Sequence, residues 1–242
     1  YYRGGFAALA DAMVEYIVAK GSEVRTSCGV DSVVIEEGKV VGVRFDNETV
    51  EPADIVLSTV HFPQHIRLME EHADDDYRDK LSKVDYLANV CLVLFLDRSL
   101  SDLYWINVND ASFPYVGVIE HTNFEPPESY GGKHVVYLSR YLPHTEKLYE
   151  MTPNEILEFS IPHIQRMFPS FKDEWILDFR VWKERFAQPV IDRHYSEKIP
   201  SFSTPVEGLY LSSMAQIYPE DRGTNYAVRE GRRAGRKIAA MI

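Results

Sequence analysis

The strand and helix patterns of this chain fall into three parts, and this division most constrains the fold. Long strand patterns occupy the middle, at Tyr86–Leu96, Leu103–Val108, Tyr115–His121, Lys133–Leu142 and Trp175–Phe186. Short strands and helices occupy both ends. We therefore predict a mixed α+β (α/β mixed) fold with a discontinuous organisation, in which the two ends share short elements and the middle forms an antiparallel sheet with helices. Such a sheet can leave one face open for a substrate or a cofactor.

The N-terminal part combines one helix with several short strands. Apolar residues recur at three-to-four spacing over Phe6–Lys20, and Gly21 ends this helical pattern. Strand patterns follow at Glu23–Thr26, Asp31–Glu36, Lys39–Phe45 and Asp54–Thr59, with a tight turn at Glu37-Gly38. The region His61–Lys83 is predicted to be helical and carries an acidic run that suits a helix N-terminus.

Two further helices and a short strand are predicted toward the C-terminus. Thr152 followed by Glu155 indicates the start of a helix over Pro153–Met167, because proline is tolerated at the first helical position. Leu209–Ser212 is predicted to be a short buried strand, and Asn225–Ile242 a closing helix. The segment Gln188–Pro205 between them is predicted to be irregular.

The charge and composition of the chain exclude several functions. Its 242 residues include 26 Lys and Arg against 37 Asp and Glu, which gives a formal net charge of −11. A general nucleic-acid binder needs a basic surface that displaces counterions, so we expect no nucleic-acid partner. No apolar stretch approaches the ~20 residues of a transmembrane helix. Cys28 and Cys91 lie in strand patterns and are predicted to be small, reduced core residues, so a cytoplasmic location is the default expectation.

Several segments, taken in order, resemble one protein family. They are Tyr1–Leu9 (YYRGGFAAL), Gly21–Val33 (GSEVRTSCGVDSV), Gly38–Val43 (GKVVGV), Ala53–Thr59 (ADIVLST), Gly208–Ser213 (GLYLSS) and Arg222–Gly235 (RGTNYAVREGRRAG). Their order and spacing resemble the C-terminal two-thirds of the FAD-dependent amine oxidase-like superfamily. Within that superfamily the chain is most similar to the phytoene desaturase and protoporphyrinogen oxidase branch.

The resemblance implies that FAD is the cofactor and gives roles to residues near the N-terminus. Gly4 and Gly5, at the start of the first helix, would permit close approach of the backbone to the cofactor. The main chain of Val30 would face the FAD adenine, and the strand that ends at Ser58-Thr59 would lie on the adenine side of the FAD-binding domain.

The resemblance also gives roles to residues near the C-terminus. Backbone N–H groups at Gly223, Thr224 and Asn225 would face the pyrimidine edge of the flavin, where a helix N-terminus favours negative charge on the reduced ring. Ser212 and Ser213 stand where the family usually has an acidic residue that binds a ribityl hydroxyl. A serine could still make a neutral hydrogen bond there.

One family motif is absent from this sequence. The phosphate-cradling Gly-x-Gly-x-x-Gly turn, with its acidic residue for the ribose, does not occur. In the family that the chain resembles this turn opens the chain, so we infer that the FAD-binding segment precedes residue 1 in a longer protein. The fragment alone is then expected to bind FAD weakly or not at all. We also expect self-association, because strands near Val30 and Leu211 would lack their covering segment.

The resemblance implies two domains and a redox activity. Residues 1–62 and 189–242 would form a partial, discontinuous FAD-binding domain, and residues 63–188 a substrate-binding domain. The reaction would transfer hydride from a C–H bond of a small-molecule substrate to the flavin, and the fragment alone would be inactive. Many Leu, Val, Phe and Tyr residues in the middle favour an apolar substrate, although core packing explains them equally well. A polyprenoid, a porphyrinogen and an amine remain open, and no catalytic residue is assigned.

Two other functions remain open from the sequence. A flavin-dependent sugar-nucleotide mutase would need basic residues aimed at a diphosphate, for which Arg140, Arg180 and Arg185 are candidates by residue type. A non-catalytic interaction domain that has lost the cofactor is favoured by the missing ribityl acid.

Several conspicuous side chains have simpler structural interpretations. His61 and His65 are four residues apart and could share a helical face, but they lack the companions of a zinc site, so no metal is predicted. His121 could reach a substrate cavity, although a structural role is favoured. The basic residues between Arg229 and Lys237 are interpreted as a solvated helix face. Four aromatic residues are interpreted mainly as core or sheet residues: Trp105, Tyr137, Tyr141 and Trp182.

Overall fold

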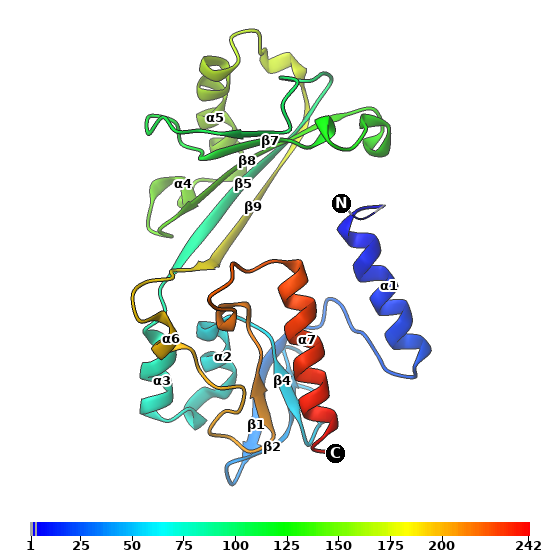
Figure 1. Cartoon of the computed structure of the whole chain (residues 1–242), viewed down its shortest axis with the longest axis vertical. Helices are drawn as coiled ribbons and strands as arrows, with labels where there is room; N and C mark the ends of the chain where they lie inside the picture. Colours follow the sequence, from blue (N-terminus) through cyan, green and yellow to red (C-terminus); the bar gives the residue numbers. More distant parts are fainter. Residues whose placement is uncertain (1, 3) are drawn as a thin grey trace. The chain divides into compact units, whose positions relative to one another are not determined.

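The chain divides into two compact units in the computed structural model, which describes residue 2 and residues 4–242. The first unit consists of Tyr1–Asp79, Pro200–Gln216 and Gly223–Ile242, and the second consists of Lys80–Ile199 and Ile217–Arg222. The first unit therefore contains both the blue and the red ends of the chain, and the second contains the green and yellow middle (Figure 1). The mixed α+β class predicted from the sequence is confirmed.

A three-stranded antiparallel sheet lies in the first unit. β1 (Val30–Glu36) pairs with β2 (Lys39–Phe45), and β2 pairs with β3 (Val50–Pro52). Glu37 and Gly38 form the turn between β1 and β2 with φ values of 50° and 78°. These values lie in the left-handed region that two-residue hairpin turns need. The hairpin predicted at these two residues is confirmed.

A parallel strand pair joins the two ends of the chain. β4 (Val56–Ser58) pairs residue by residue with β10 (Leu209–Leu211). Leu211 is fully buried, as expected in a strand of a parallel sheet. Gly208 precedes β10 with a φ of +82°, and a Cβ atom there would lie 2.5 Å from the backbone oxygen of Asp54. Only glycine therefore fits where the C-terminal strand enters the sheet.

Helices complete the first unit. They are α1 (Gly5–Ala19), α2 (Phe62–Met69), the first part of α3 (Asp75–Ser82) and α7 (Thr224–Ala239), with 3-10 turns at Glu70–His72 and Met214–Gln216. None of the residues of α1 is buried. α7 buries Ala234, and the side chains of Arg236 and Lys237 in its last turn suit the helix dipole.

Polar side chains fix the starts of α2 and α3. Nδ1 of His61 accepts a hydrogen bond from the backbone N–H of Gln64 (3.1 Å), and Asp74 accepts one from the backbone N–H of Tyr77 (2.8 Å). Nε2 of His65 lies 3.2 Å from the Tyr77 hydroxyl in the interior. Complete burial of His65 lowers its pKa to about 4. His61 and His65 therefore have separate structural roles, as a cap and as a core residue.

The second unit contains a five-stranded antiparallel sheet in the order β6-β7-β8-β5-β9. The strands are β5 (Tyr86–Leu96), β6 (Trp105–Asn107), β7 (Gly117–Glu120), β8 (His134–Leu142) and β9 (Ile176–Pro189). Helices α4 (Lys147–Glu150) and α5 (Pro153–Met167) bury one face of this sheet. The buried cluster includes Val90, Leu92, Leu94, Leu96, Val136, Leu138, Leu142, Leu148, Ile156 and Ile164. Short helical segments at His121–Asn123, Pro127–Tyr130, Asp173–Trp175 and Tyr195–Lys198 (α6) complete the unit.

The start of α5 agrees with the sequence prediction. The Thr152 hydroxyl accepts a hydrogen bond from the backbone N–H of Glu155 (3.4 Å), and the Glu155 carboxylate accepts one from the backbone N–H of Thr152 (2.7 Å). This reciprocal capping box satisfies two N–H groups at the helix start. The predicted helix over Pro153–Met167 is confirmed at both ends.

A buried carboxylate organises the loop before β6. Glu120 is only 1% exposed. It accepts hydrogen bonds from the backbone N–H groups of Leu100 (2.8 Å) and Ser101 (2.9 Å) and from the hydroxyl of Ser99 (2.6 Å). These donors replace the water that the charged group loses on burial.

Some sequence predictions are wrong. Glu23–Thr26 lies in a loop rather than a strand, and Arg25 in this loop pairs with Glu23 and Glu51. A strand needs a partner, and no pairing reaches this segment among the described residues. Cys28 is exposed in the same loop rather than in a core, whereas Cys91 is half-buried in β5; both are free.

No helix in the described part of the chain is both long and apolar enough to cross a bilayer. The predicted domain ranges, 1–62 with 189–242 and 63–188, differ in their boundaries from the two compact units. The roles assigned to those domains stay a prediction.

Candidate functional site

The parallel pair β4–β10 carries polar residues at its C-terminal ends. The backbone N–H of Ser212, which follows β10, donates to the backbone carbonyl oxygen of Ser58 (2.9 Å). Ser213 is 7% exposed, and its N–H donates to the side-chain oxygen of Gln216 (2.7 Å). The Ser58 hydroxyl is buried and makes no hydrogen bond within the described residues. An unpaired buried hydroxyl is costly, so it marks a place where a ligand group would find a partner.

The start of α7 has free backbone donors. Gly223 is the N-cap residue and has an extended φ of −166°. It has no side chain that could accept a hydrogen bond from the first N–H groups of the helix. The first helical residues, Thr224 and Asn225, are exposed, and their N–H groups make no hydrogen bond with any described part of the chain. Such a helix start favours an anionic or electron-rich ligand edge. This geometry agrees with the role that the resemblance implies for Gly223–Asn225, which stays a prediction.

The N-terminal candidates lie at two other places in the first unit. Gly4 and Gly5 have φ values of +87° and +85° at the start of α1, where other residues would be strained. Val30 begins β1, and its carbonyl oxygen accepts a hydrogen bond from Nη2 of Arg67 (3.3 Å). Arg67 also pairs with Asp31 at 3.6 Å. The Val30 carbonyl therefore already has a partner on α2, which the sequence did not indicate.

The structure brings only some of the candidate residues together. Ser212 and Ser213 directly follow β10, whose last residue, Leu211, pairs with Ser58 on β4. Within the described residues, no hydrogen bond links Val30 or Gly4 with the turn at Gly223. All eight candidates nevertheless belong to the first unit. Ser58 is a further polar residue that was not among the eight candidates. Its place at the end of a buried strand is the feature of the sequence that could have indicated it.

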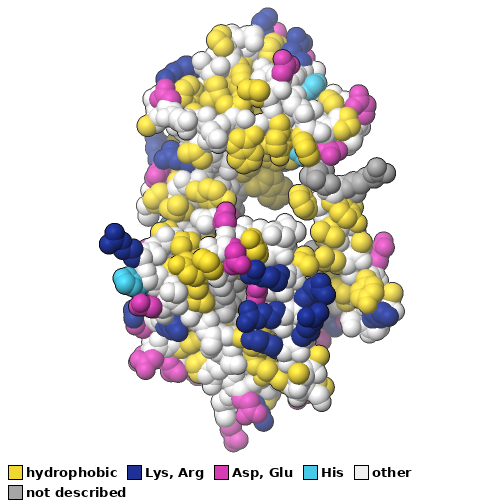
Figure 2. Space-filling view, in the orientation of Figure 1, with side chains coloured by type: hydrophobic (Ala, Val, Ile, Leu, Met, Phe, Trp, Pro, Cys, Tyr) yellow, Lys and Arg dark blue, Asp and Glu magenta, His cyan; other side chains and the backbone are white. Residues whose placement is uncertain are grey.

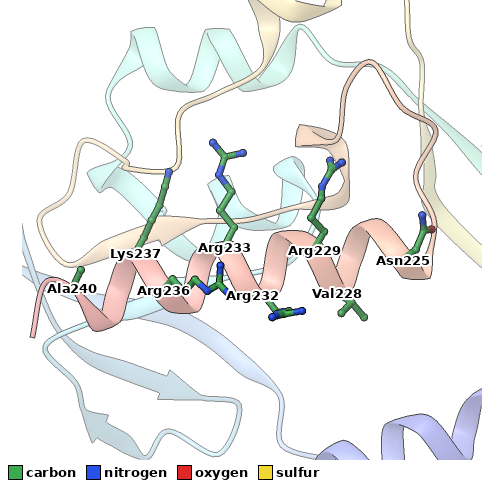
Figure 3. A pocket seen from close by; sticks show the side chains of 8 residues that line it. All are labelled: Asn225, Val228, Arg229, Arg232, Arg233, Arg236, Lys237 and Ala240. Atoms are coloured by element: carbon green, nitrogen blue, oxygen red, sulfur yellow. The ribbon is translucent and has the colours of Figure 1, made fainter.

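A row of basic side chains covers much of α7. Figure 2 shows Lys and Arg gathered on this helix. A surface depression beside it is lined by Asn225, Val228, Arg229, Arg232, Arg233, Arg236, Lys237 and Ala240. Arg229, Arg233 and Lys237 extend to one side of the helix, whereas Arg232 and Arg236 extend to another (Figure 3). All five are exposed, which confirms the prediction of a solvated helix face.

The two groups of basic residues differ in their contacts. Arg229 and Arg233 pair with Glu230 at 2.8 and 3.7 Å. The ammonium group of Lys237 lies 4.6 Å from the centre of the Phe202 ring. No hydrogen bond or ion pair links Arg232 or Arg236 to any other described residue.

An apolar groove lies between α1 and α7. Its lining consists of Phe6, Leu9, Ala10, Met13, Thr224, Ala227, Val228, Gly231 and Arg232, and its volume is about 530 Å³. A Cβ atom added at Gly231 would meet nothing within 4 Å, so the helix surface is open here. We refer to this feature as the α1–α7 groove.

The face of the second unit's sheet that α4 and α5 do not cover carries aromatic and small side chains. Residues paired directly across antiparallel strands point to the same face. The pairing places Trp182 opposite Cys91, Cys91 opposite Ser139, and Ser139 opposite Gly117. A neighbouring row contains Trp105, Ile119, Tyr137, Val93 and Arg180. We call this surface the open sheet face.

The open sheet face carries exposed aromatic rings at its edges, beside charged side chains of β9 such as Arg180. Trp182 is 68% exposed and Trp105 54%, so they are not core residues. Tyr141, on the same face, is 45% exposed. Burial raises the pKa of the Cys91 thiol to about 11, so the thiol is neutral near pH 7. Single exposed aromatic residues are common, but a cluster on one face indicates a binding surface.

His121 serves a local structural role. Its Nε2 atom hydrogen-bonds with the Tyr130 hydroxyl, and its ring meets the Tyr137 ring edge-on with centroids 6.0 Å apart. Desolvation lowers its pKa, which favours the neutral ring. The structural interpretation of His121 is therefore favoured by its contacts.

Comparison with known proteins gives one family and a common fold. The sequence matches the family described as flavin containing amine oxidoreductase over residues 1–239. A phytoene desaturase (neurosporene-forming) from Rhodobacter capsulatus is 39% identical over 59 residues, which is 24% of this chain and 11% of that protein.

Two solved structures illustrate the likeness of fold. An oxidoreductase from Methanosarcina mazei has a TM-score of 0.66 at 22% identity, covering 87% of this chain and 49% of its own. A protein assigned as a protoporphyrinogen oxidase from Exiguobacterium sp. 255-15 has a TM-score of 0.69 at 17% identity, covering 87% of this chain and 46% of its own. The chain thus spans about half the length of these structures.

Proposed function

Because the chain belongs to the flavin containing amine oxidoreductase family, we propose that it is part of an FAD-dependent oxidoreductase that removes hydride from a C–H bond of an organic substrate. The observation that carries the proposal is the β4–β10 pair, which joins the two ends of the chain in one unit. The start of α7, which has no side-chain cap, follows β10 along the chain. FAD, when bound, supplies a two-electron acceptor for the hydride.

The described residues fit parts of such a cofactor. The free N–H groups of Thr224 and Asn225 would hold the electron-rich edge of the flavin and stabilise negative charge there. Ser212 and Ser213 would offer neutral hydrogen bonds to the ribityl chain. The unpaired Ser58 hydroxyl is a further available partner. The sequence contains no glycine-rich phosphate turn, so we propose that a preceding segment supplies the pyrophosphate site.

The open sheet face would bind and orient a substrate with apolar surface. Trp182 and Trp105 offer flat aromatic rings, and the small side chains of Gly117, Ser139 and Cys91 leave room between strands. Covering this face with substrate would exclude water from the reacting C–H bond.

FAD binding by the chain tests the cofactor assignment. After mixing with FAD and gel filtration, we expect no stoichiometric yellow protein; one would overturn the placement of the pyrophosphate site outside these residues. Weak binding is measured by quenching of flavin fluorescence. Thr224→Pro removes one N–H at a helix position that tolerates proline. It should weaken binding roughly tenfold, as expected for one hydrogen bond to a charged group, whereas Thr224→Ala should not.

Tryptophan fluorescence tests the substrate face. The chain has three tryptophans, and the third, Trp175, packs against Phe171 away from the open sheet face. An apolar ligand on the face should quench Trp105 and Trp182, and this quenching should persist in Trp175→Phe. Quenching that is lost in Trp175→Phe would contradict the assignment.

A flavin-dependent sugar-nucleotide mutase is less well supported. The arginines considered for a diphosphate site already have partners: Arg140 pairs with Glu146 and Arg180 with Asp178, at 2.9 and 2.6 Å. Arg185 lies 3.2 Å from His144. A non-catalytic interaction domain is the alternative if a longer form of the protein also binds no FAD.

A further inference from the structure

Arg222 anchors the end of the segment that leads into α7. Its Nε atom donates a hydrogen bond to the side-chain oxygen of Gln188 (2.7 Å), and its Nη2 atom donates to the same oxygen. Its Nη1 atom donates to the backbone carbonyl oxygen of Ala187. Both acceptors lie near the end of β9. The planar guanidinium group can bind both at once because its donors have a fixed fork geometry.

Tyr141, on the open sheet face, is a third partner of Arg222. Its hydroxyl lies 3.4 Å from Nη2 of Arg222, and the centre of its ring lies 6.0 Å from the guanidinium carbon. Tyr141 belongs to β8, and β8 and β9 lie on either side of β5 in the sheet. The half-buried Arg222 side chain therefore joins two strands that are not neighbours, and all its partners belong to the second unit.

The chain leaves the second unit directly after Arg222. Arg222 is the last residue of that unit, and Gly223 begins the next stretch of the first unit. Two residue steps span at most about 7 Å, so Thr224 cannot lie far from the anchored backbone of Arg222. The Gly223 carbonyl oxygen accepts hydrogen bonds from the N–H groups of Tyr226 (3.0 Å) and Ala227 (2.9 Å). A restraint on Arg222 thus reaches the first turn of α7 through one intervening residue.

The other end of this segment is held separately. The Tyr218 ring packs against the fully buried Tyr195, with ring centres 5.7 Å apart. Loss of the Arg222 contacts would therefore release only the residues between Tyr218 and α7. The start of α7 has no side-chain cap that could replace this anchor.

These contacts give Arg222 a role in the site of the first unit. We propose that Arg222 is a positioning residue for the start of α7, which holds the free N–H groups of Thr224 and Asn225 in place for the edge of a ligand. The inference rests on the proposed function in one respect, because that function identifies the ligand edge as the flavin. Arg222 acts through the covalent chain and touches neither cofactor nor substrate. Donors that are fixed before binding lower the cost of ordering and stabilise charge more effectively.

A purely structural role in the sheet is the alternative for Arg222. The pairing of β5 with β9 shifts register between Leu87 and Asn89, opposite this end of β9. Such an irregularity can leave a backbone group without a ladder partner, and Arg222 would then only satisfy the Ala187 carbonyl. In that role, loss of Arg222 would loosen β9 and leave α7 unchanged. The two roles therefore differ in where the effect of a substitution appears.

Amide hydrogen exchange of the full chain, without FAD, tests the restraint. In Arg222→Ala the amides of Tyr226 and Ala227 should exchange about tenfold faster, because the Gly223 carbonyl that accepts their hydrogen bonds is released. Arg140→Ala is the matched control. Arg140 also contacts a backbone carbonyl and a side chain within the second unit, and its loss should leave these amides unchanged. Faster exchange confined to β9, or no protection of these amides in the wild type, would overturn the proposal.

Gln188 offers a pair of variants that leave Arg222 in place. Gln188→Glu keeps an oxygen that accepts from Arg222, whereas Gln188→Leu removes it. Both variants lose the amide donor that contacts the Pro189 carbonyl (3.3 Å), so they differ in the contact with Arg222. Exchange in the first turn of α7 should match the wild type in Gln188→Glu and be faster in Gln188→Leu. Equal exchange in the two variants would overturn the proposal.

FAD affinity connects the restraint with the ligand. Quenching of flavin fluorescence measures it, on a longer form of the protein if the chain alone binds too weakly. Arg222→Ala should weaken binding about fivefold in the otherwise unchanged protein, but only about twofold in Thr224→Pro, which lacks one of the N–H groups that Arg222 positions. The same factor in both backgrounds would indicate an independent structural role and would overturn the proposal.

Failure of the proposed function gives a different result. A longer form that binds no FAD would refute the oxidoreductase function. Faster exchange at the start of α7 in Arg222→Ala would still support the restraint by Arg222, because that measurement involves no cofactor.

Discussion

Acidification should destabilise the first unit through His65. The ring is 0% exposed, and burial lowers its pKa from about 6.5 to about 4. The folded state therefore binds a proton less readily than the unfolded state. The stability contributed by the neutral ring is complete above pH 6.5 and is lost progressively as the pH falls toward 4. A difference of 2.5 pKa units corresponds to about 3.5 kcal/mol at ~1.4 kcal/mol per unit.

The assay must report on the first unit. All three tryptophans lie in the second unit, so their fluorescence would not detect this change. Amide hydrogen exchange across α2, measured at pH values between 7.5 and 4, is the suitable readout after correction for the intrinsic exchange rate. The free energy of opening should fall by about 1 kcal/mol per pH unit or slightly more between pH 6 and 4.

Two variants make the test specific. His65→Gln should be less stable at pH 7.5 and should lose most of the pH dependence in this range. His72→Gln changes an exposed histidine near the same helices and should keep the pH dependence of the wild type. If His65→Gln retained the full pH dependence, burial of His65 would not be its cause.

Four further substitutions should have separable effects on stability. Gly208→Ala should destabilise by more than 2 kcal/mol, because its Cβ would lie 2.5 Å from the Asp54 oxygen, whereas Gly38→Ala, with φ +78° and open space, should cost only about 1 kcal/mol; urea denaturation followed by circular dichroism compares them. Glu120→Gln should cost about 2–4 kcal/mol, because an amide group faces donors that the carboxylate accepted; urea denaturation followed by tryptophan fluorescence measures it, and an unchanged midpoint would contradict the reasoning. Thr152→Ala should cost about 1 kcal/mol in the same assay through loss of the capping box.

Elements whose signals are local were predictable from the sequence. The strand Lys39–Phe45 and the helix Pro153–Met167 are found with their predicted bounds, because a turn at Gly38 and a capping box at Thr152 fix their ends. The predicted strand Glu23–Thr26 is wrong because strand formation depends on a partner that a short local pattern does not specify. The exposure of Cys28 follows from the same error.

The candidate site was predictable only in its local parts. The sequence placed Ser212 and Ser213 after a strand, and Gly223 before a helix, because these signals are short-range. It could not indicate that Arg67 contacts the Val30 carbonyl, because the two residues are 37 positions apart and meet through tertiary folding. The sequence indicated that Trp182 is a core or sheet residue, and it lies in β9. It could not indicate that Trp182 lies on the open sheet face, because strand register determines which side chains share a face.

The first helix has a consequence for how this chain behaves in solution. None of the fifteen residues of α1 is buried, and Phe6 and Tyr16 are 55% and 66% exposed. A helix of this length without tertiary packing is only marginally stable in water. Its amide protons should therefore exchange within seconds while the strands around Leu211 retain theirs, and a protease should cleave this segment before any other regular element. Part of the binding free energy of any molecule that packs against α1 would therefore be spent on ordering this helix. Such a molecule would bind less tightly than its contact area suggests.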